Sequence, residues 1–384
     1  MRILLLNFYP VINASGGTEK IFAKVANRFS QRGHAVTAAF FENKHGKPFY
    51  HFDSSIQLIN LYKKDQLTVW NRLLLKIKNF HILARRRHRK ERKYQSKFIK
   101  NIVCEYLSKN QFDIIFVFQP ESIKYLPENK SVKTVLTLHG AASYYFDYYD
   151  YERLLYALKY PDIVTVLLPS YKSQIQQYTT AKVLQIPNGI SSTLIRYYRD
   201  KSSKKIIYLA RVSSRKQHHL LIEAFSKIKN QLVGWTIEFW GDCTCDVSYF
   251  EFLKKLVKRY KLRETVLFCG VTSNVAEKLS QAQICVFPSK YEGFGMGLLE
   301  AMAVGLPCIG FKTSPGVNEL ITNYDNGILV DNSVNALACG ILELIQNRTL
   351  QEKMSYHAKL FAKSFDDENV FFKWERLLKN TVDL

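Results

Sequence analysis

The stretch from Pro288 to Pro307 contains the residues whose types and spacing are best suited to chemistry. It reads PSKYEGFGMGLLEAMAVGLP, and seven residues separate Glu292 from Glu300. We expect a strand before it, a glycine loop, and a helix that begins near Gly297. Loop N–H groups and the dipole at a helix N-terminus favour phosphate, and carboxylates accept hydrogen bonds from sugar hydroxyls. The stretch therefore predicts a site for a ligand that carries both phosphate and sugar.

Basic and glycine residues follow two other expected strands. Arg211 and Lys216 come directly after the apolar run 205–209, where positive charge suits a diphosphate. A solvated basic loop would have the same composition, so both interpretations stay open for this pair alone. Gly16 and Gly17 follow a first strand, where backbone N–H groups can approach an anion, although a Gly-Gly pair is more often a plain turn.

Short apolar runs alternate with helical patterns along nearly the whole chain. Continuous apolar runs are typical of buried parallel strands. A helix is expected at 18–32, with Gly33 suited to its end. The expected strands are 2–8, 34–40, 113–118, 133–138, 162–167 and 183–186, then 205–209, 236–240, 266–269, 284–287, 308–311 and 327–330. The pattern predicts an α/β protein of two doubly wound domains, in which ligands bind at the carboxyl ends of the strands.

Together with further short motifs, these residues resemble the retaining glycosyltransferases of family 4, also called glycosyl transferases group 1. The resemblance covers nearly the whole chain and implies the GT-B fold, two Rossmann-like domains that face each other across a cleft. The implied domains are 1–190 for the acceptor, 204–365 for the nucleotide sugar, and 366–384 as a helix that returns to the first domain. The motifs are GGTE at 16–19, LHG at 138–140, IPNG at 186–189, the Arg211/Lys216 pair, the Glu292–Glu300 string, GVNE at 316–319 and NGILV at 326–330.

The resemblance implies a role for each matching residue. His139 would touch the transferred sugar, Arg211 and Lys216 would neutralise the leaving diphosphate, and Glu292 would bind donor-sugar hydroxyls; these four form the expected catalytic set. Leu298 and Leu299 would present N–H groups to phosphate, and Glu300 would bind the ribose. The expected donor-binding residues are Gly16, Gly17, Asn188, Arg211, Lys216, Glu292, Gly295, Leu298, Leu299 and Glu300.

The sequence departs from the family pattern at three places around these motifs. Ala210 stands where the family usually has glycine, and Gln217 follows Lys216 where glycine is common. The residues 240–243, Trp-Gly-Asp-Cys, replace a usual Gly-x-Gly. These changes bear on the loop geometry near the expected phosphate site.

The implied reaction moves a sugar from a nucleotide-diphosphate sugar, favoured to be a UDP-sugar, to a glycan or lipid-linked acceptor. This is a hexosyltransferase-type activity with retention of configuration, in cell-surface polysaccharide or lipopolysaccharide synthesis. The acceptor hydroxyl would attack on the face from which the diphosphate departs. The sequence contains no Asp-x-Asp pair, so metal independence is expected, and no cofactor beyond the nucleotide-sugar co-substrate.

A strong positive charge is concentrated in one segment. Residues 63–100 carry 14 Lys and Arg against two acidic residues, about half of the chain's net +22. Leu67, Trp70, Leu74 and Ile77 recur at helical spacing before the basic block 85–90. This pattern favours a helix on the surface of an anionic membrane. The alternative is a core-packed helix followed by a solvated basic one.

Charge and composition also bound the other classes of function. A basic membrane- or nucleic-acid-binding protein without catalysis is the alternative to an enzyme, but no nucleic-acid-binding motif is found. The brief apolar start, the lack of a run of about 20 apolar residues and seven scattered cysteines predict a cytoplasmic chain. We expect it to be peripheral on the inner face of the membrane, with no nucleic-acid partner and no metal site.

A run of tyrosines follows His139 and Gly140. Residues 144–151 read YYFDYYDY. Aromatic rings at this place could stack on an acceptor sugar or could serve only for packing, and the sequence favours neither.

Overall fold

The computed structural model describes residues 1–8, 11–14, 16–43, 46–62 and 84–382, with the backbone alone at 84–95 and 382. The chain divides into two compact units, Met1–Gln185 and Ile186–Leu384. The boundary falls slightly before the expected one at 190–203. The return of residues 366–384 to the first domain stays a prediction.

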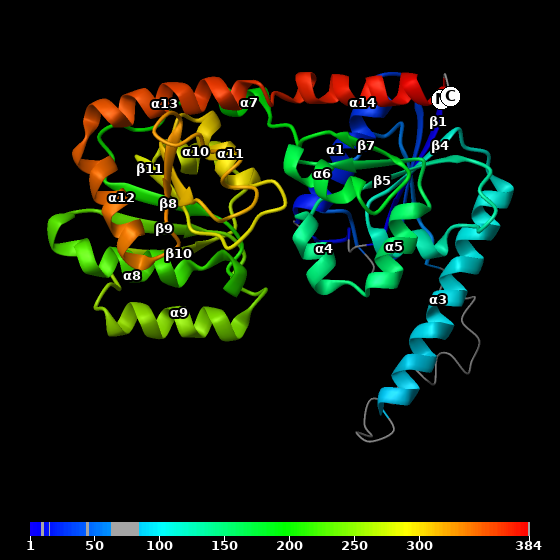
Figure 1. Ribbon diagram of the computed structural model, residues 1–384, viewed down its shortest axis with the longest axis horizontal. Helices are drawn as coiled ribbons and strands as arrows, with labels where there is room; N and C mark the ends of the chain where they lie inside the picture. Colours follow the sequence, from blue (N-terminus) through cyan, green and yellow to red (C-terminus); the bar gives the residue numbers. More distant parts are fainter. Residues whose placement is uncertain (9–10, 15, 44–45, 63–83, 383–384) are drawn as a thin grey trace. The chain divides into compact units, whose positions relative to one another are not determined.

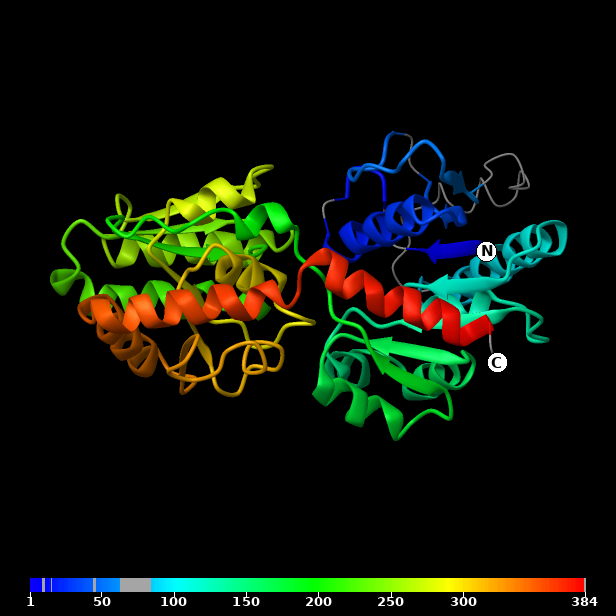
Figure 2. The same ribbon diagram turned by 90° about the horizontal axis from the view of Figure 1, so that it is seen from above.

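Unit 1 is built on a parallel sheet of seven strands in the order β3-β2-β1-β4-β5-β6-β7. The strands follow one another from blue to green in Figure 2. In β1 every residue after Arg2 is buried, because helices cover both faces of a doubly wound sheet. The strands are β1 Arg2–Asn7, β2 Ala35–Phe40, β3 Gln57–Asn60, β4 Ile114–Val117, β5 Lys133–Thr137, β6 Ile163–Val166 and β7 Lys182–Gln185.

The helices of unit 1 connect successive parallel strands, as βαβ units require. The amphipathic helix α1 buries Phe22, Val25 and Phe29 on one side. The helical segments are α1 Gly17–Gln31, α3 Ala84–Lys109, η2 Pro120–Tyr125, α4 Ala142–Tyr148, α5 Tyr151–Lys159 and α6 Pro169–Gln176.

Helix α3 carries the basic block of the sequence in its first turns. Its later turns pack beside η2, where the Cys104 thiol donates to the Tyr125 carbonyl oxygen and Lys100 pairs with Glu128. In Figure 1 the first turns of α3, in cyan, extend away from the strands of unit 1. The expected amphipathic pattern at Leu67–Ile77 lies outside the described residues.

Unit 2 contains a parallel sheet of six strands in the order β10-β9-β8-β11-β12-β13. Helix α12 packs against α8 and α13 packs against α11, which gives two groups of helices around the strands (Figure 1). The strands are β8 Lys205–Leu209, β9 Thr236–Trp240, β10 Val266–Gly270, β11 Ile284–Phe287, β12 Cys308–Phe311 and β13 Gly327–Val330. The helical segments are α7 Ser192–Ile195, η3 Ser214–Lys216, α8 His218–Ile228, η4 Lys229–Gln231, α9 Val247–Arg259, α10 Val275–Ser280, α11 Met296–Ala303, α12 Val334–Gln346, α13 Arg348–Lys363 and α14 Asp367–Val382.

All twelve expected strands form, with each end within one residue of the expected position, and one further strand was missed. This is β3, a four-residue edge strand whose last three residues are only half-buried. Its sequence QLIN has no continuous apolar run, so periodicity gave no signal. Among the described residues, no helix combines the length and the apolar character needed to cross a membrane.

Candidate functional site

Two glycines determine the conformation and the packing of the loop between β11 and α11. Gly295 is the N-cap of α11 and has φ of 87°, a left-handed conformation that favours glycine. A Cβ on Gly297 would lie 2.4 Å from the carbonyl oxygen of Leu209, the last residue of β8. The first turn of α11 therefore packs directly on the carboxyl end of β8, and a side chain at residue 297 would separate them.

Backbone contacts fix the position of Glu292 independently of the contacts of its side chain. Its N–H donates to the Pro315 carbonyl oxygen at 2.8 Å. Gly316 has φ of 84°, and a Cβ there would lie 2.7 Å from the Glu292 carbonyl oxygen. Two loops that follow different strands thus lock together and fix the position of the Glu292 carboxylate.

A buried polar network joins Glu292 to the end of β8. Lys216 Nζ lies 2.5 Å from Glu292 Oε1, and the Ser289 hydroxyl donates to the same oxygen at 2.5 Å. The Tyr208 hydroxyl lies 2.7 Å from Ser289 Oγ and 3.0 Å from the Lys216 carbonyl oxygen. Ser289 and Tyr208 are fully buried, and Glu292 is 8% exposed. We call Tyr208, Lys216, Ser289 and Glu292 the Lys216–Glu292 network.

This network has the electrostatics of a site built to hold charge. Burial, and then the nearby Glu292 carboxylate, raise the pKa of Tyr208 well above its usual value, so Tyr208 stays a neutral hydrogen-bonding group. A cation and a carboxylate held together away from water interact strongly, because little solvent screens them. An incoming anion would meet Lys216 at the edge of the network, where its side chain is 21% exposed.

Arg211 is an exposed residue that follows β8, one position after Ala210. The Ala210 N–H donates to the Trp240 carbonyl oxygen at 2.9 Å, which extends the β8–β9 pairing to this point. A Cβ on Gly241 would lie 2.1 Å from the Ala210 carbonyl oxygen, so only glycine allows this approach. Hydrogen bonds from Thr244 and the charge of Arg211 hold the pKa of Asp242 below its usual value.

The departures from the family pattern have structural counterparts in these loops. Gln217, which stands where glycine is common, has φ of 50° and adopts the left-handed conformation that glycine takes most easily. Gln217 therefore adopts a backbone conformation that glycine would also allow. The Lys216 N–H donates to the Ser213 carbonyl oxygen at 2.9 Å, and this turn directs the Lys216 side chain to Glu292.

Helix α11 supplies the other expected donor-binding groups of unit 2. Glu300 lies in its second turn and is 5% exposed. The Leu299 N–H donates to the Gly295 carbonyl oxygen at 3.0 Å within the helix. The first three N–H groups of a helix have no acceptor of this kind, and Leu298 provides the third of them. The helix end therefore offers Leu298, rather than Leu299, to an anion.

His139 of unit 1 follows β5, and its ring is fixed by two contacts. Its ring stacks on Phe118 with 5.4 Å between ring centroids, and its Nε2 lies 3.1 Å from the Thr137 hydroxyl. That hydroxyl donates to the Val117 carbonyl oxygen, so its oxygen accepts a hydrogen bond from the Nε2–H of His139. Nδ1 is buried and accepts no hydrogen bond from the described residues. Burial lowers the pKa of His139 to about 4, so the ring is neutral at pH 7.

Gly16 and Gly17 lie at the N-terminus of α1 in unit 1, as the N-cap and the first residue. A Cβ on Gly16 would lie 1.9 Å from a Glu19 carboxylate oxygen, so that side chain folds back over the N-cap. A carboxylate near a helix N-terminus is favourable because of the helix dipole. An anionic ligand at these glycines must therefore share or displace the position of Glu19.

Asn188 lies in the connection after β7, at the start of unit 2, and is 8% exposed. Its neighbour Ile190 exchanges backbone hydrogen bonds with Phe365 and Asp367 near the start of α14, at 2.9 and 3.0 Å. Asn188 thus belongs to the segment that joins the two ends of unit 2.

Sequence reasoning missed two members of the Lys216–Glu292 network. Ser289 lies three residues before Glu292 in the quoted string, and that spacing could have indicated a local hydrogen bond. Tyr208 lies inside an apolar strand, where a tyrosine gives no separate signal. The sheet neighbours β8 and β11 bring these residues together although about 80 residues separate them.

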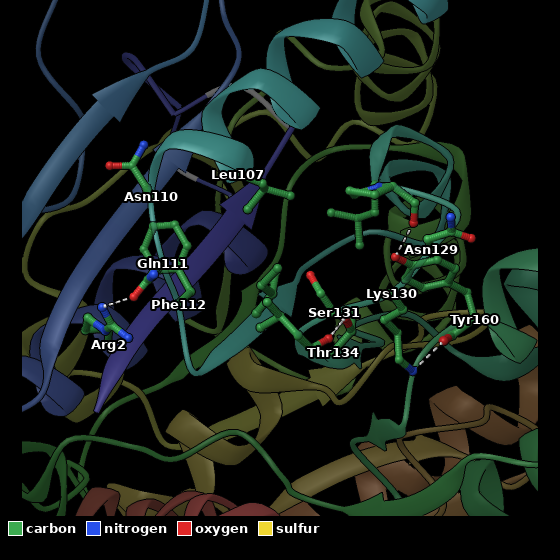
Figure 3. Close-up of a pocket in the computed structure, with 14 residues that line it drawn as sticks. Arg2, Leu107, Asn110, Gln111, Phe112, Asn129, Lys130, Ser131, Thr134 and Tyr160 are labelled. Atoms are coloured by element: carbon green, nitrogen blue, oxygen red, sulfur yellow. Dashed lines mark hydrogen bonds between the residues drawn. The ribbon is translucent and has the colours of Figure 1, made fainter.

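A cavity of about 330 Å³ lies in unit 1 near the amino-terminal ends of β1, β4 and β5, whereas His139 follows the carboxyl-terminal end of β5. Figure 3 shows Arg2, Phe112, Lys130 and Tyr160 around it. Its two cations are paired, Arg2 with Asp113 and Lys130 with Asp162. This cavity contains none of the expected site residues, and we do not assign it to the functional site.

Comparisons with known proteins give a consistent result. Residues 195–361 match the family model described as glycosyl transferases group 1. An uncharacterized glycosyltransferase of Haemophilus influenzae is 25% identical over 382 residues, which cover 97% of this chain and 98% of that one. Sucrose-phosphate synthase from Thermosynechococcus elongatus has a TM-score of 0.80 at 19% identity, over 100% of this chain and 99% of that chain. Anabaena HepE in complex with UDP and glucose has a TM-score of 0.72 at 18% identity, over 99% of this chain and 100% of that chain. The predicted GT-B architecture of two Rossmann-like domains is confirmed.

Proposed function

We propose that this chain is a glycosyltransferase of group 1, the family whose model matches residues 195–361, and that it transfers a hexose from a UDP-sugar to a glycan or lipid-linked acceptor, with retention of configuration. We place it in family 4 and assign it to the synthesis of a cell-surface polysaccharide or lipopolysaccharide. The proposed reaction uses no metal ion and no cofactor apart from the donor.

The Lys216–Glu292 network is the observation that carries this proposal. It places a cation next to a carboxylate that is 8% exposed, beside the first turn of a helix. Lys216, Arg211 and the Leu298 N–H supply positive charge for a departing diphosphate. Glu292 supplies an acceptor for sugar hydroxyls. Fixed groups of this kind stabilise charge as it develops in the transition state.

The nucleotide is proposed to bind beside the same helix. Glu300 is a buried carboxylate two residues beyond Leu298 in the same helix, where it can accept hydrogen bonds from ribose hydroxyls. The choice of UDP draws on the structural similarity to HepE, whose structure contains UDP and glucose.

The proposed chemistry is a substitution on one face of the donor sugar. The acceptor oxygen forms the new bond to the anomeric carbon as the bond from that carbon to the phosphate oxygen breaks. The acceptor proton passes to the departing phosphate oxygen, so no separate base is required. Glu292 is not assigned as a nucleophile, because Lys216 and Ser289 hold its Oε1 in hydrogen bonds. His139, neutral at pH 7, contacts the transferred sugar.

The basic segment 63–100 is proposed to hold the enzyme on an anionic membrane at the inner face, in the cytoplasm. Each Lys or Arg near such a surface contributes about 1 kcal/mol. Peripheral binding would place unit 1 where a lipid-linked acceptor presents its hydroxyl.

A screen of UDP-, GDP-, ADP- and dTDP-sugars for turnover tests the proposal. We expect one or more UDP-sugars to be hydrolysed slowly without acceptor and faster with a glycan acceptor, and EDTA to leave the rate unchanged. Arg211→Ala should lower turnover by on the order of 100-fold, because it removes a positive charge that stabilises the leaving diphosphate. Arg259→Ala, at an exposed arginine of α9 to which no role in the site is assigned, is the matched control. Turnover of no nucleotide sugar, or full activity of a folded Arg211→Ala variant, would contradict the proposal.

A further inference from the structure

Helix α4 and its C-cap residue together carry four tyrosines next to the loop that carries His139. We call Tyr144, Tyr145, Tyr148 and Tyr149 the tyrosine cluster. Their rings contact one another, with 5.0 Å between the centroids of Tyr144 and Tyr148 and 5.4 Å between those of Tyr145 and Tyr149. The sequence left open whether this run serves packing or binding.

Tyr145 ties the cluster to the His139 loop. Its hydroxyl oxygen accepts hydrogen bonds from two backbone N–H groups, that of His139 at 3.1 Å and that of Gly140 at 2.8 Å. Tyr145 is 5% exposed. A Cβ on Gly140 would lie 3.1 Å from the Tyr145 hydroxyl and 3.3 Å from a Tyr144 ring carbon. The cluster is therefore in direct contact with the backbone that positions His139.

The rest of α4 is anchored, which leaves one part of the cluster exposed and rigid. Phe146 packs on Tyr178 with 4.5 Å between centroids, and the Tyr149 hydroxyl donates to Glu121 at 2.8 Å. Tyr148 is 63% exposed. A large exposed ring on a fixed helix offers an apolar face together with a polar hydroxyl, and it loses little conformational freedom when a ligand binds.

The charge around the cluster narrows the chemistry of its ligand. Residues 141–153 contain three acidic residues against one basic residue, Arg153, in a chain with a net charge of +22. Asp147 is exposed beside Tyr148 in the sequence. Like charges repel, so an anionic ligand or an anionic membrane surface is disfavoured here. An uncharged sugar, whose C–H face can lie on an aromatic ring while its hydroxyls reach carboxylates, meets no such penalty.

We propose that the tyrosine cluster is the acceptor subsite, in which Tyr144 and Tyr148 receive an uncharged sugar ring and Tyr145 holds the His139 loop against it. Tyr145 is a positioning residue in this arrangement. The inference rests on the proposed function, since it names the acceptor class for that reaction.

The first experiment measures sugar binding directly and does not depend on turnover. Saturation-transfer NMR with the full chain uses the methyl glycosides of glucose, galactose and N-acetylglucosamine as neutral probes and methyl glucuronide as the anionic probe. At least one neutral glycoside should give a signal that Tyr144→Ala and Tyr148→Ala weaken by about fivefold or more. Tyr156→Ala, an exposed tyrosine on α5 outside the cluster, is the matched control and should bind as the wild type does. Asp147→Asn removes a negative charge and should therefore reduce the difference between the binding signals of methyl glucoside and methyl glucuronide.

The second experiment separates acceptor binding from chemistry. With the donor found by the nucleotide-sugar screen, Tyr148→Ala should raise the acceptor KM about five- to tenfold, whereas the control Tyr156→Ala should keep the acceptor KM and the rate of donor hydrolysis of the wild type. Tyr145→Phe should instead lower kcat, because the N–H groups of His139 and Gly140 lose their acceptor. Tyr148→Phe keeps the aromatic ring and should raise the acceptor KM less than Tyr148→Ala does.

The outcomes distinguish this proposal from the proposed function. If no neutral glycoside binds, or if binding is equal in the wild type and the Tyr144→Ala and Tyr148→Ala variants, the acceptor subsite is wrong even when nucleotide sugars are turned over. Stronger binding of methyl glucuronide, or loss of binding to phosphatidylglycerol vesicles in Tyr148→Ala, would also overturn it. If neutral glycosides bind as expected but no nucleotide sugar is turned over, the proposed transferase reaction fails and the sugar site stands.

Discussion

Removal of Lys216 should separate the structural role of its ion pair from its chemical role. In Lys216→Met the Glu292 carboxylate, which is 8% exposed, loses a cation that lies 2.5 Å away, while the hydrogen bond from Ser289 remains. Breaking a fully buried pair costs about 3–5 kcal/mol. Because the Lys216 side chain is 21% exposed, solvent screens part of this pair, and we expect a loss of about 1–3 kcal/mol in the free energy of unfolding.

The same change should lower kcat/KM by on the order of 100-fold, or about 3 kcal/mol, because the leaving diphosphate loses a fixed positive charge. Glu292→Gln alone removes the other half of the pair. The double variant Lys216→Met, Glu292→Gln leaves no unpaired charge in this place. Its stability should therefore lie closer to that of the wild type than the sum of the two single losses predicts, whereas its activity should not recover.

Urea unfolding and steady-state kinetics on the four proteins of this cycle measure both effects. Additive stability losses would show that Lys216 and Glu292 are not coupled as the structure places them. Turnover of Lys216→Met within a fewfold of the wild type would remove Lys216 from the chemistry, whatever the stability result.

Three further predictions follow from the remaining observations. Proton NMR of the first-formed product should show an α-linkage from an α-linked donor, and a β-linkage would overturn the family 4 placement. Burial lowers the pKa of His139 to about 4, below its unfolded value of about 6.5. The contribution of His139 to the free energy of unfolding is therefore complete above pH 6.5 and is lost as the pH falls from 6.5 to 4. Over that pH range the wild type should lose more stability than His139→Asn. Because of the same shift, we expect that His139 causes no fall in the kcat of the wild type near pH 6.5. A fall in kcat near pH 6.5 that is present in the wild type and absent in His139→Asn would show that the ring ionises in the native state. Vesicles with anionic lipid should co-sediment the protein at low salt and less at physiological salt, and replacement of the five basic residues in 85–90 by Gln should weaken this binding; indifference of the wild type to anionic vesicles would refute membrane attachment through this segment.

The sequence predicted the parts of the site that depend on neighbouring residues. The loop and helix from Glu292 to Glu300 formed as expected, because glycine, apolar strand and helix signals act over a few residues. The order of the elements indicated two doubly wound sheets for the same reason. The use of the Leu299 N–H within α11 also follows from local helix geometry, and counting from the N-cap Gly295 would have shown it.

Other features have no signal in local sequence. Gln217 takes a left-handed conformation because the turn after β8 directs Lys216 inward. The glutamine side chain gives no sequence signal for this conformation. The edge strand β3 forms because β2 offers it unpaired backbone groups, although its own residues are only half-buried. Both are cases in which the surrounding structure overrides the preference of the residue.

By itself, the sequence determined that this chain has two α/β units, which motifs end their strands, and that its charge is concentrated in 63–100. Only the tertiary structure decided which of those residues meet. Lys216 and Glu292 are 76 positions apart, and they pair because β8 and β11 are neighbours in the sheet. Tyr208 and Ser289 are 81 positions apart, and they meet for the same reason. The physical reason is that backbone preferences act over a few residues, whereas the pairing of side chains depends on the order and register of strands, which the whole chain fixes together.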